Sequence, residues 1–181
     1  MKKVLIIIGI IIAAVILIPL IVALFTKKEY RVVKEVTINQ PIEEVFDYIL
    51  MLKNQDEFSV WSKIDPKMKS EYRGTDGTVG FVSAWESDNP DVGKGEQEIT
   101  RIEPGARIDY ELRFLEPFES TSLAFMTTES LSETSTLVKW GFSGEMKYPM
   151  NLMLVVMDFE GMIGNDLQSG LNNLKIILEN Q

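Results

Sequence analysis

Alternating charged side chains on one predicted strand are the first candidates for acid–base chemistry, and they are Arg107, Asp109, Glu111 and Arg113. A two-residue period is typical of a β-strand, so these four would share one face. Facing a cavity, Asp109 or Glu111 could act as a general acid or base. Facing solvent, the same charges would form cross-strand ion pairs, and we favour this interpretation. The same reasoning applies to Glu96 and Glu98.

The residue types that most often carry catalysis and metal binding are missing. The chain has no cysteine and no histidine, which excludes a thiol nucleophile, a disulfide, an imidazole base and a His-ligated metal. No zinc motif, phosphate-binding glycine loop or serine nucleophile elbow is present. Asp158, Glu160 and Asp166 lack the spacing of a calcium loop. We therefore assign no catalytic residue, no metal and no cofactor.

Aromatic and methionine side chains are the candidates for binding an apolar ligand. Aromatic rings can stack on a flat molecule, and methionine adapts to irregular shapes. The predicted pocket-lining residues are Trp61, Trp85, Tyr110, Trp140, Phe142, Met157 and Met162. The alternative for each is ordinary core packing, because Val138, Trp140 and Phe142 alternate as a core strand does, and methionines, Met150 and Met153 included, are good filler.

Charge excludes one class of partner. The net charge of the 181 residues is −9, and the first 29 residues carry four lysines and one glutamate. The remainder has 14 basic and 26 acidic residues, a net charge of −12. A domain this acidic is repelled by phosphate backbones, so nucleic acid is not an expected partner.

The N-terminus predicts a membrane anchor. Val4 to Phe25 is a run of 22 uncharged residues between Lys2-Lys3 and Lys27-Lys28, and about 20 apolar residues cross a bilayer. A cleaved signal peptide is the alternative, but its apolar region is shorter and ends in small residues. We predict an anchor in residues 1–29, a domain in 30–181 and a single-pass location in the cell membrane. Lysines at both ends leave the orientation weakly determined, with the domain favoured outside the cytoplasm.

Most of the domain has the period of β-strands. We predict a strand over 30–39, a helix from Pro41 to Leu50 and a short helix over 53–58, then six strands at 68–72, 79–86, 95–102, 107–114, 121–129 and 136–145. Turn residues such as Gly74-Thr75-Asp76-Gly77 separate them. Consecutive strands joined by short turns form an antiparallel meander that curls strongly.

The stretch from Asn151 to Asn180 predicts the cover of that sheet. Its apolar residues recur every three or four positions, as on one face of a long helix. Gly161, Gly164 and Gly170 each disfavour a helix by roughly 1 kcal/mol relative to alanine. We therefore expect either a bend near 161–164 or space there for a ligand or a close backbone approach.

The pattern resembles the helix-grip superfamily of START domains, the birch-pollen allergen and polyketide cyclases, and within it the bacterial membrane-anchored SRPBCC, polyketide-cyclase-like group. The matching residues are Glu35-Val36-Thr37-Ile38, Pro41, Val45-Phe46, Trp61-Ser62, Asp65-Pro66, Met68, Gly80, Trp85, Gly93, Gly95, Ile99, Arg107-Ile108-Asp109-Tyr110, Phe114, Pro117, Val138-Lys139-Trp140, Gly144, Pro149-Met150-Asn151, Met162-Ile163-Gly164 and Gly170-Leu171-Asn172-Asn173-Leu174. The resemblance implies an α+β helix-grip fold, with a curved antiparallel sheet of about seven strands wrapped on a long C-terminal helix. It also implies binding of hydrophobic small molecules, with only some branches being enzymes.

Three functions remain open at this point. The first is a membrane-tethered module that binds a hydrophobic or lipid-like small molecule between the sheet and the C-terminal helix. The second is a cyclase- or hydratase-type enzyme, which requires an acidic residue with a raised pKa on the pocket side of a strand. The third is a protein-interaction module, which requires a filled cavity and an exposed apolar patch. We favour the first.

Overall fold

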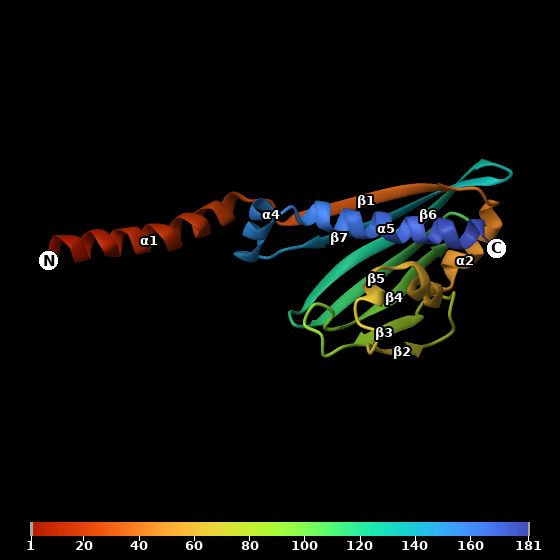
Figure 1. Cartoon of the computed structure of the whole chain (residues 1–181), viewed down its shortest axis with the longest axis horizontal. Helices are drawn as coiled ribbons and strands as arrows, with labels where there is room; N and C mark the ends of the chain where they lie inside the picture. Colours follow the sequence, from red (N-terminus) through yellow and green to blue (C-terminus); the bar gives the residue numbers. More distant parts are fainter. Residues whose placement is uncertain (1, 181) are drawn as a thin grey trace.

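The computed structural model describes residues 2–180 and shows a curved sheet that grips one long helix (Figure 1). The strands are β1 (Glu29–Ile38), β2 (Lys69–Arg73), β3 (Val82–Glu86), β4 (Lys94–Glu103), β5 (Arg107–Glu116), β6 (Ser120–Ser132) and β7 (Ser135–Glu145). The main helices are α1 (Lys2–Phe25), α2 (Ile42–Leu50) and α5 (Phe159–Glu179), with short helical segments η1 (Leu52–Asn54), α3 (Gln55–Phe58), η2 (Trp61–Lys63), η3 (Met150–Leu152) and α4 (Met153–Val156). The predicted α+β helix-grip fold is confirmed.

The seven strands form one antiparallel sheet in the order β1-β7-β6-β5-β4-β3-β2. Consecutive strands from β2 to β7 are neighbours, as in a meander, and β1 joins the free edge of β7. The sheet does not close into a barrel, because β1 and β2 remain separate edges. Register pairs Tyr30 with Gly144, Gly144 with Ser122, and Phe114 with Gly95. Tyr30, Gly144 and Ser122 therefore form one row across the sheet, and Phe114 and Gly95 lie in the neighbouring row, closer to the strand ends near α1.

Helix α5 lies along β1 on the concave side of the sheet (Figure 1). Leu167, Leu171 and Leu174 have no exposed surface and form the apolar stripe that the sequence predicts. On the β1 side, Lys175 Nζ donates to the Thr37 carbonyl oxygen at 2.7 Å. On the other flank, Asn173 Nδ2 donates to the Phe58 carbonyl oxygen at 3.0 Å. Both edges of the helix are thus tied to its neighbours.

The C-terminal helix is interrupted earlier than the sequence predicts. We expected one helix from 151 to 180, with either a bend near Gly161–Gly164 or space there for a ligand or a close backbone approach, but Met157 is extended and separates α4 from α5. The Asp158 side chain caps α5 by accepting a hydrogen bond from the Gly161 N–H at 3.0 Å. The apolar period continues through the break, whereas the capping aspartate determines where the helix begins.

Helix α1 projects away from the domain (Figure 1). Its apolar side chains are exposed on nearly every side, and it is long and apolar enough to be a membrane span or a signal sequence. Its last turn is held to the domain by Asn151, whose Nδ2 donates to the carbonyl oxygens of Ala23 at 2.7 Å and Thr26 at 3.0 Å. The segment η3–α4 therefore lies directly beside the end of α1.

Candidate functional site

The half of the concave face farthest from α1 is filled by large side chains. Tyr110 and Trp140 are 1% and 3% exposed and belong to the same core cluster as Leu167 and Leu171. The ring of Trp140 contacts Phe58 and Trp61 edge to face, at centroid distances of 5.5 and 5.9 Å. Gly170 lets α5 approach this cluster, because a Cβ there would lie 2.7 Å from Trp140 Cζ3. This half is an ordinary packed core.

The half of the concave face nearest α1 has a different composition. Small or polar residues occupy many of its inward positions, namely Ser70, Ser83, Gly95, Gln97, Ser122 and Gly144. Between them lie four aromatic residues, Tyr30, Trp85, Phe114 and Phe142, three of which are only partly buried. Aromatic walls with small and hydroxyl side chains between them are typical of a ligand-binding surface.

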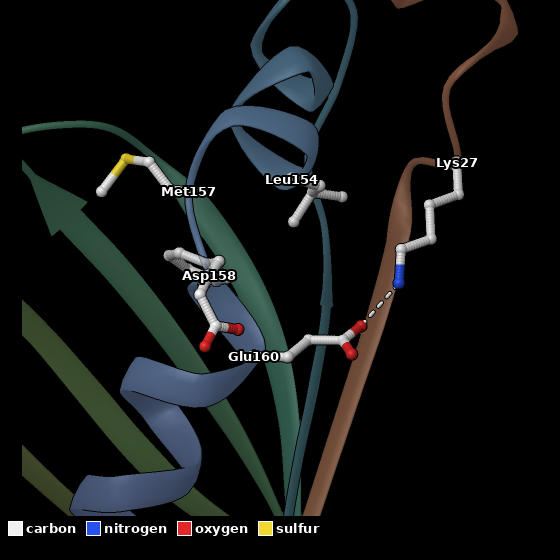
Figure 2. A pocket seen from close by; sticks show the side chains of 6 residues that line it. Lys27, Leu154, Met157, Asp158 and Glu160 are labelled. Atoms are coloured by element: carbon white, nitrogen blue, oxygen red, sulfur yellow. Dashed lines mark hydrogen bonds and ion pairs between the residues drawn. The ribbon is translucent and has the colours of Figure 1, made fainter.

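An open groove of about 670 Å³ lies at this end of the sheet, at the ends of β1, β7 and β6. Tyr30, Ser122 and Gly144 line it from the concave side, and Arg31, Leu123 and Ser143 line it from the convex side. Lys27 and Glu160 form part of its rim, so the groove crosses the end of the sheet. A smaller hollow of about 80 Å³ lies next to it between α4 and the start of α5 (Figure 2). Lys27 Nζ contacts Glu160 Oε1 at 2.7 Å, and both residues line both spaces. The ion pair therefore stands between the groove and the hollow.

Tyr30 organises the floor of the groove. Its ring stacks on Phe142 at 6.1 Å and meets the edge of Phe159 at 4.9 Å. Its hydroxyl lies over Gly144, where a Cβ would come within 2.4 Å of it. Burial raises the pKa of Tyr30, and a hydrogen bond with Ser122 partly opposes this rise. The phenol therefore stays protonated at neutral pH and presents a polar group at an otherwise aromatic wall.

The predicted pocket-lining residues divide between the two halves. Trp61, Tyr110 and Trp140 lie in the packed half. Phe142 lies beside Tyr30 in the open half, and Trp85 packs edge to face on Phe114 there, at 5.9 Å. Met157 and Met162 are exposed, in the break between α4 and α5 and on the first turn of α5. A ligand-lining role for any of the seven stays a prediction.

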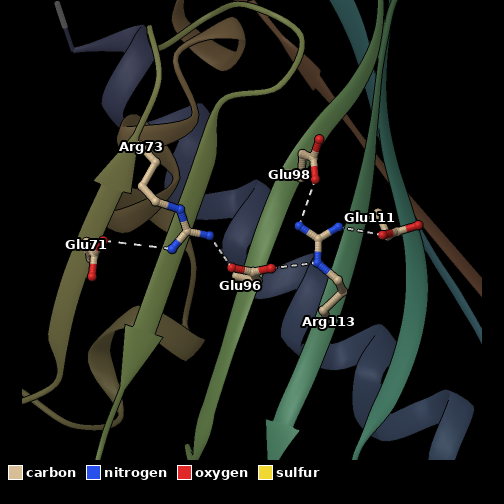
Figure 3. Close-up of polar contacts among 6 residues, drawn as sticks. All are labelled: Glu71, Arg73, Glu96, Glu98, Glu111 and Arg113. Carbon is tan, nitrogen blue, oxygen red and sulfur yellow. Dashed lines mark hydrogen bonds and ion pairs between the residues drawn. The ribbon is translucent and has the colours of Figure 1, made fainter.

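The alternating charges lie on the convex face of the sheet, away from the groove. Arg113 donates to Glu96, Glu98 and Glu111 at 2.6–2.7 Å, and Arg73 also contacts Glu96 (Figure 3). Hydrogen bonds from the two arginines lower the pKa of Glu96. These carboxylates are partners in a surface network of ion pairs, which is the solvent-facing arrangement that we favoured from the sequence.

Carboxylates elsewhere also have structural partners. Asp158 caps α5 and Glu160 pairs with Lys27. Among residues 2–180, no group of three acidic side chains is placed to hold a metal ion.

The sequence did not identify Tyr30, Ser122, Gly144 or the Lys27–Glu160 pair as site residues. The sequence feature that could have indicated this site is the presence of small and polar residues at inward strand positions, where a core strand would carry large apolar residues. That signal needs the strand register, which brings Tyr30, Gly144 and Ser122 into one row.

The chain is similar to one known protein family and to several solved structures. The sequence profile of the polyketide cyclase / dehydrase and lipid transport family matches residues 29–179. No curated protein sequence matches the chain significantly. Among solved structures, Ara h 8.0201 is similar with a TM-score of 0.59 at 14% identity, over 84% of this chain and 99% of that one.

Two further solved structures show the range of proteins with this fold. Protein MLL2253 from Mesorhizobium loti has a TM-score of 0.59 at 18% identity, over 84% of this chain and 98% of that one. The di-domain ARO/CYC StfQ from the steffimycin biosynthetic pathway has a TM-score of 0.62 at 10% identity, over 84% of this chain and 51% of that one. Identities this low show a shared fold alone.

Proposed function

The chain belongs to the polyketide cyclase / dehydrase and lipid transport family, and on that premise we propose that it is a membrane-tethered binding module for a hydrophobic or lipid-like small molecule. Residues 1–29 form the tether and residues 30–181 the binding domain. Ligands that partition into a bilayer are concentrated where the domain sits. The proposal thus joins the two distinctive parts of the chain, an apolar helix and a domain of a family associated with such ligands.

The observation that carries the proposal is the division of the concave face into two halves. The half under the leucines of α5 has no room for a ligand. The half with Tyr30, Phe142 and Phe114 combines aromatic walls with glycine and serine, and the groove of about 670 Å³ at its end is lined by Lys27, two residues after α1. We expect an apolar ligand to enter from the membrane side, between the ends of β1, β7 and β6 and the start of α5.

The membrane location rests on α1. Its 24 residues span about 36 Å as a helix, enough to cross a hydrocarbon core of about 30 Å. We propose a single-pass protein of the cell membrane with the domain outside the cytoplasm. The substitution Leu131→Cys, at an exposed position near the end of β6, tests the orientation by its labelling with a membrane-impermeant maleimide in intact cells.

The enzyme alternative lacks its distinguishing feature among the described strands. Inward strand positions carry no Asp or Glu, and the pKa of Glu96 on the convex face is lowered, whereas an acid catalyst needs it raised. The interaction-module alternative has more support, because half of the concave face is filled. We favour ligand binding over it, since the other half carries the small and polar residues of a binding surface.

Native mass spectrometry of the full chain released from detergent micelles tests the proposal. We expect a co-purifying small molecule that organic extraction removes and that a matching lipid restores. Ser122→Leu should reduce its occupancy by filling the groove, whereas Ser132→Leu, at the distal turn, should leave occupancy unchanged. A chain that is free of ligand and gains no thermal stability from lipids or polycyclic aromatics would favour the interaction module instead.

A further inference from the structure

An uncharged apolar segment is exposed on the surface of the domain. Residues 148–157 read Tyr-Pro-Met-Asn-Leu-Met-Leu-Val-Val-Met, ten residues without a charge in a chain that is 25% charged. Met150, Val155 and Val156 are 57%, 60% and 66% exposed. A contiguous apolar patch on an otherwise acidic domain marks a surface that contacts something apolar.

The position of this segment indicates what that apolar partner is. Asn151 is fully buried and holds η3 against the last turn of α1 through the carbonyl oxygens of Ala23 and Thr26. The Met146 N–H donates to the Lys28 carbonyl oxygen at 2.8 Å, so the chain entering the segment is paired with the chain leaving α1. Figure 1 shows α4 beside the end of α1. Any bilayer that α1 spans therefore ends at the level of this segment.

We propose that residues 148–157 insert into the interfacial region of the bilayer as a second membrane contact beside α1. The inference rests on the proposed function, because it takes α1 as a membrane span. Val155 and Val156 would lie at the boundary of the acyl chains, and Tyr148 at the headgroups, where tyrosine is enriched. Lys28 and Lys147, which flank the Met146 pairing, would lie among the lipid phosphates.

A second contact has a consequence that the anchor alone does not have. A single helix leaves a domain free to rotate about the helix axis and to tilt. A second contact beside the helix would restrict this rotation and tilt, and would hold one end of the domain against the bilayer. Lys27 and Glu160, at the rim of the groove, lie next to this segment (Figure 2), so the groove would be held facing the lipids.

Depth-dependent fluorescence quenching of the full chain tests the proposal. Because the chain has no cysteine, one cysteine can be placed at Val155, at Val15 in the middle of α1, or at Leu131 near the end of β6. Each variant carries an environment-sensitive fluorophore and is reconstituted in phosphatidylcholine–phosphatidylglycerol vesicles with nitroxide-labelled lipids. We expect a shallow nitroxide to quench position 155 at least about twofold more strongly than position 131.

The other outcomes separate the inference from its premise. Quenching at 15 with none at 155 leaves the anchor in place and overturns the inference. No quenching at either position overturns the anchor as well. A label at 155 that is shielded from aqueous iodide but not quenched by lipid nitroxides would identify a second copy of the chain as the occupant, and the inference would be wrong.

A variant gives an independent measurement. Val155→Asp with Val156→Asp places two charges on side chains that are already exposed to water in the isolated domain, so the fold should be retained, as circular dichroism would check. We expect lipid quenching of a label at position 150 to fall by at least half, because carboxylates resist insertion. A matched pair of charges on exposed apolar residues elsewhere, Leu131→Asp with Ile176→Asp, should leave that quenching unchanged. Equal quenching in all three proteins would overturn the proposal.

Discussion

The side-chain nitrogen of Asn151 lies 2.7 Å from the carbonyl oxygen of Ala23, a residue 128 positions earlier in the chain. The same nitrogen also donates to Thr26. The last carbonyl groups of a helix have no partner within the helix, so Asn151 acts as a C-terminal cap supplied from the other end of the chain. Asn151 therefore helps to set the direction of the domain relative to α1, together with the Met146–Lys28 hydrogen bond.

Replacing Asn151 should loosen the connection between domain and anchor. Asn151→Ala removes two hydrogen bonds worth about 1 kcal/mol each. Asn151→Asp should be worse, since a carboxylate accepts hydrogen bonds and would lie against two carbonyl oxygens. We expect tryptic cleavage at Lys27 and Lys28 to be fastest in Asn151→Asp, slower in Asn151→Ala and slowest in the wild type. Asn165→Ala, on the exposed side of α5, is the control, and cleavage rates that match it would show that Asn151 does not restrain the linker.

The Lys27–Glu160 pair should control access to the groove and contribute little to stability. Both side chains are largely exposed, at 59% and 43%, and such pairs contribute about 0–1 kcal/mol. We expect Glu160→Gln to change the free energy of unfolding by less than about 0.5 kcal/mol while speeding the release of a bound fluorescent lipid. The charge exchange Lys27→Glu with Glu160→Lys should restore slow release. If both variants released the lipid at the wild-type rate, the pair would have no gating role.

The glycines of α5 should respond oppositely to alanine, because different groups lie opposite them. At Gly164 an added Cβ lies 2.7 Å from Cε of Lys34, the flexible end of a side chain that can move aside, and 3.3 Å from Cγ1 of Val32, which has to shift by only a few tenths of an ångström. Gly164→Ala should therefore gain up to about 1 kcal/mol of helix propensity. At Gly170 the Cβ lies 2.7 Å from the buried ring of Trp140, and overpacking there should cost about 1–3 kcal/mol.

Chemical unfolding of the two alanine variants, followed by tryptophan fluorescence, measures both values. The prediction is wrong if the two substitutions change stability in the same direction.

The fold could be predicted from the sequence because its signals are local. Val36 and Ile38, or Ile108 and Tyr110, show their strand by alternation, and the leucines at 167, 171 and 174 show the helix by their spacing. The start of α5 was less predictable. Residues 152–157 are apolar on every side, so they satisfy a helical period without being amphipathic, and only the Asp158 cap determines the true beginning.

The site could be predicted less well because it depends on the register between strands. Trp140 and Phe142 are two residues apart and equally aromatic, yet one packs under Gly170 and the other lies beside Tyr30 near the groove. The register between β6 and β7 decides the neighbours of each residue, because it pairs Trp140 with Met126 and Phe142 with Ala124. Those pairings join residues far apart in the sequence, and composition does not encode them.

The pH dependence of stability should depend in part on Glu96. Hydrogen bonds from Arg73 and Arg113 lower the pKa of this carboxyl below its usual value of 4.5, so the folded state favours the ionised form. The resulting stabilisation is fully present above the pKa of the unfolded chain and is lost as the pH falls through the lower pKa of the folded chain. Glu96→Gln should therefore destabilise the domain by about 1–2 kcal/mol near neutral pH. The difference from wild type should shrink steadily below about pH 4.5.

Chemical unfolding in mild detergent at a series of pH values measures that difference. Glu71→Gln is the matched control, because Glu71 is 73% exposed and lies 3.9 Å from Arg73. A gap between Glu96→Gln and wild type that stayed constant from neutral to acidic pH would show that Glu96 contributes by packing rather than by charge. A gap that widened on acidification would require its pKa to be raised in the folded chain, and the arginine network of Figure 3 would then have been given the wrong electrostatic role.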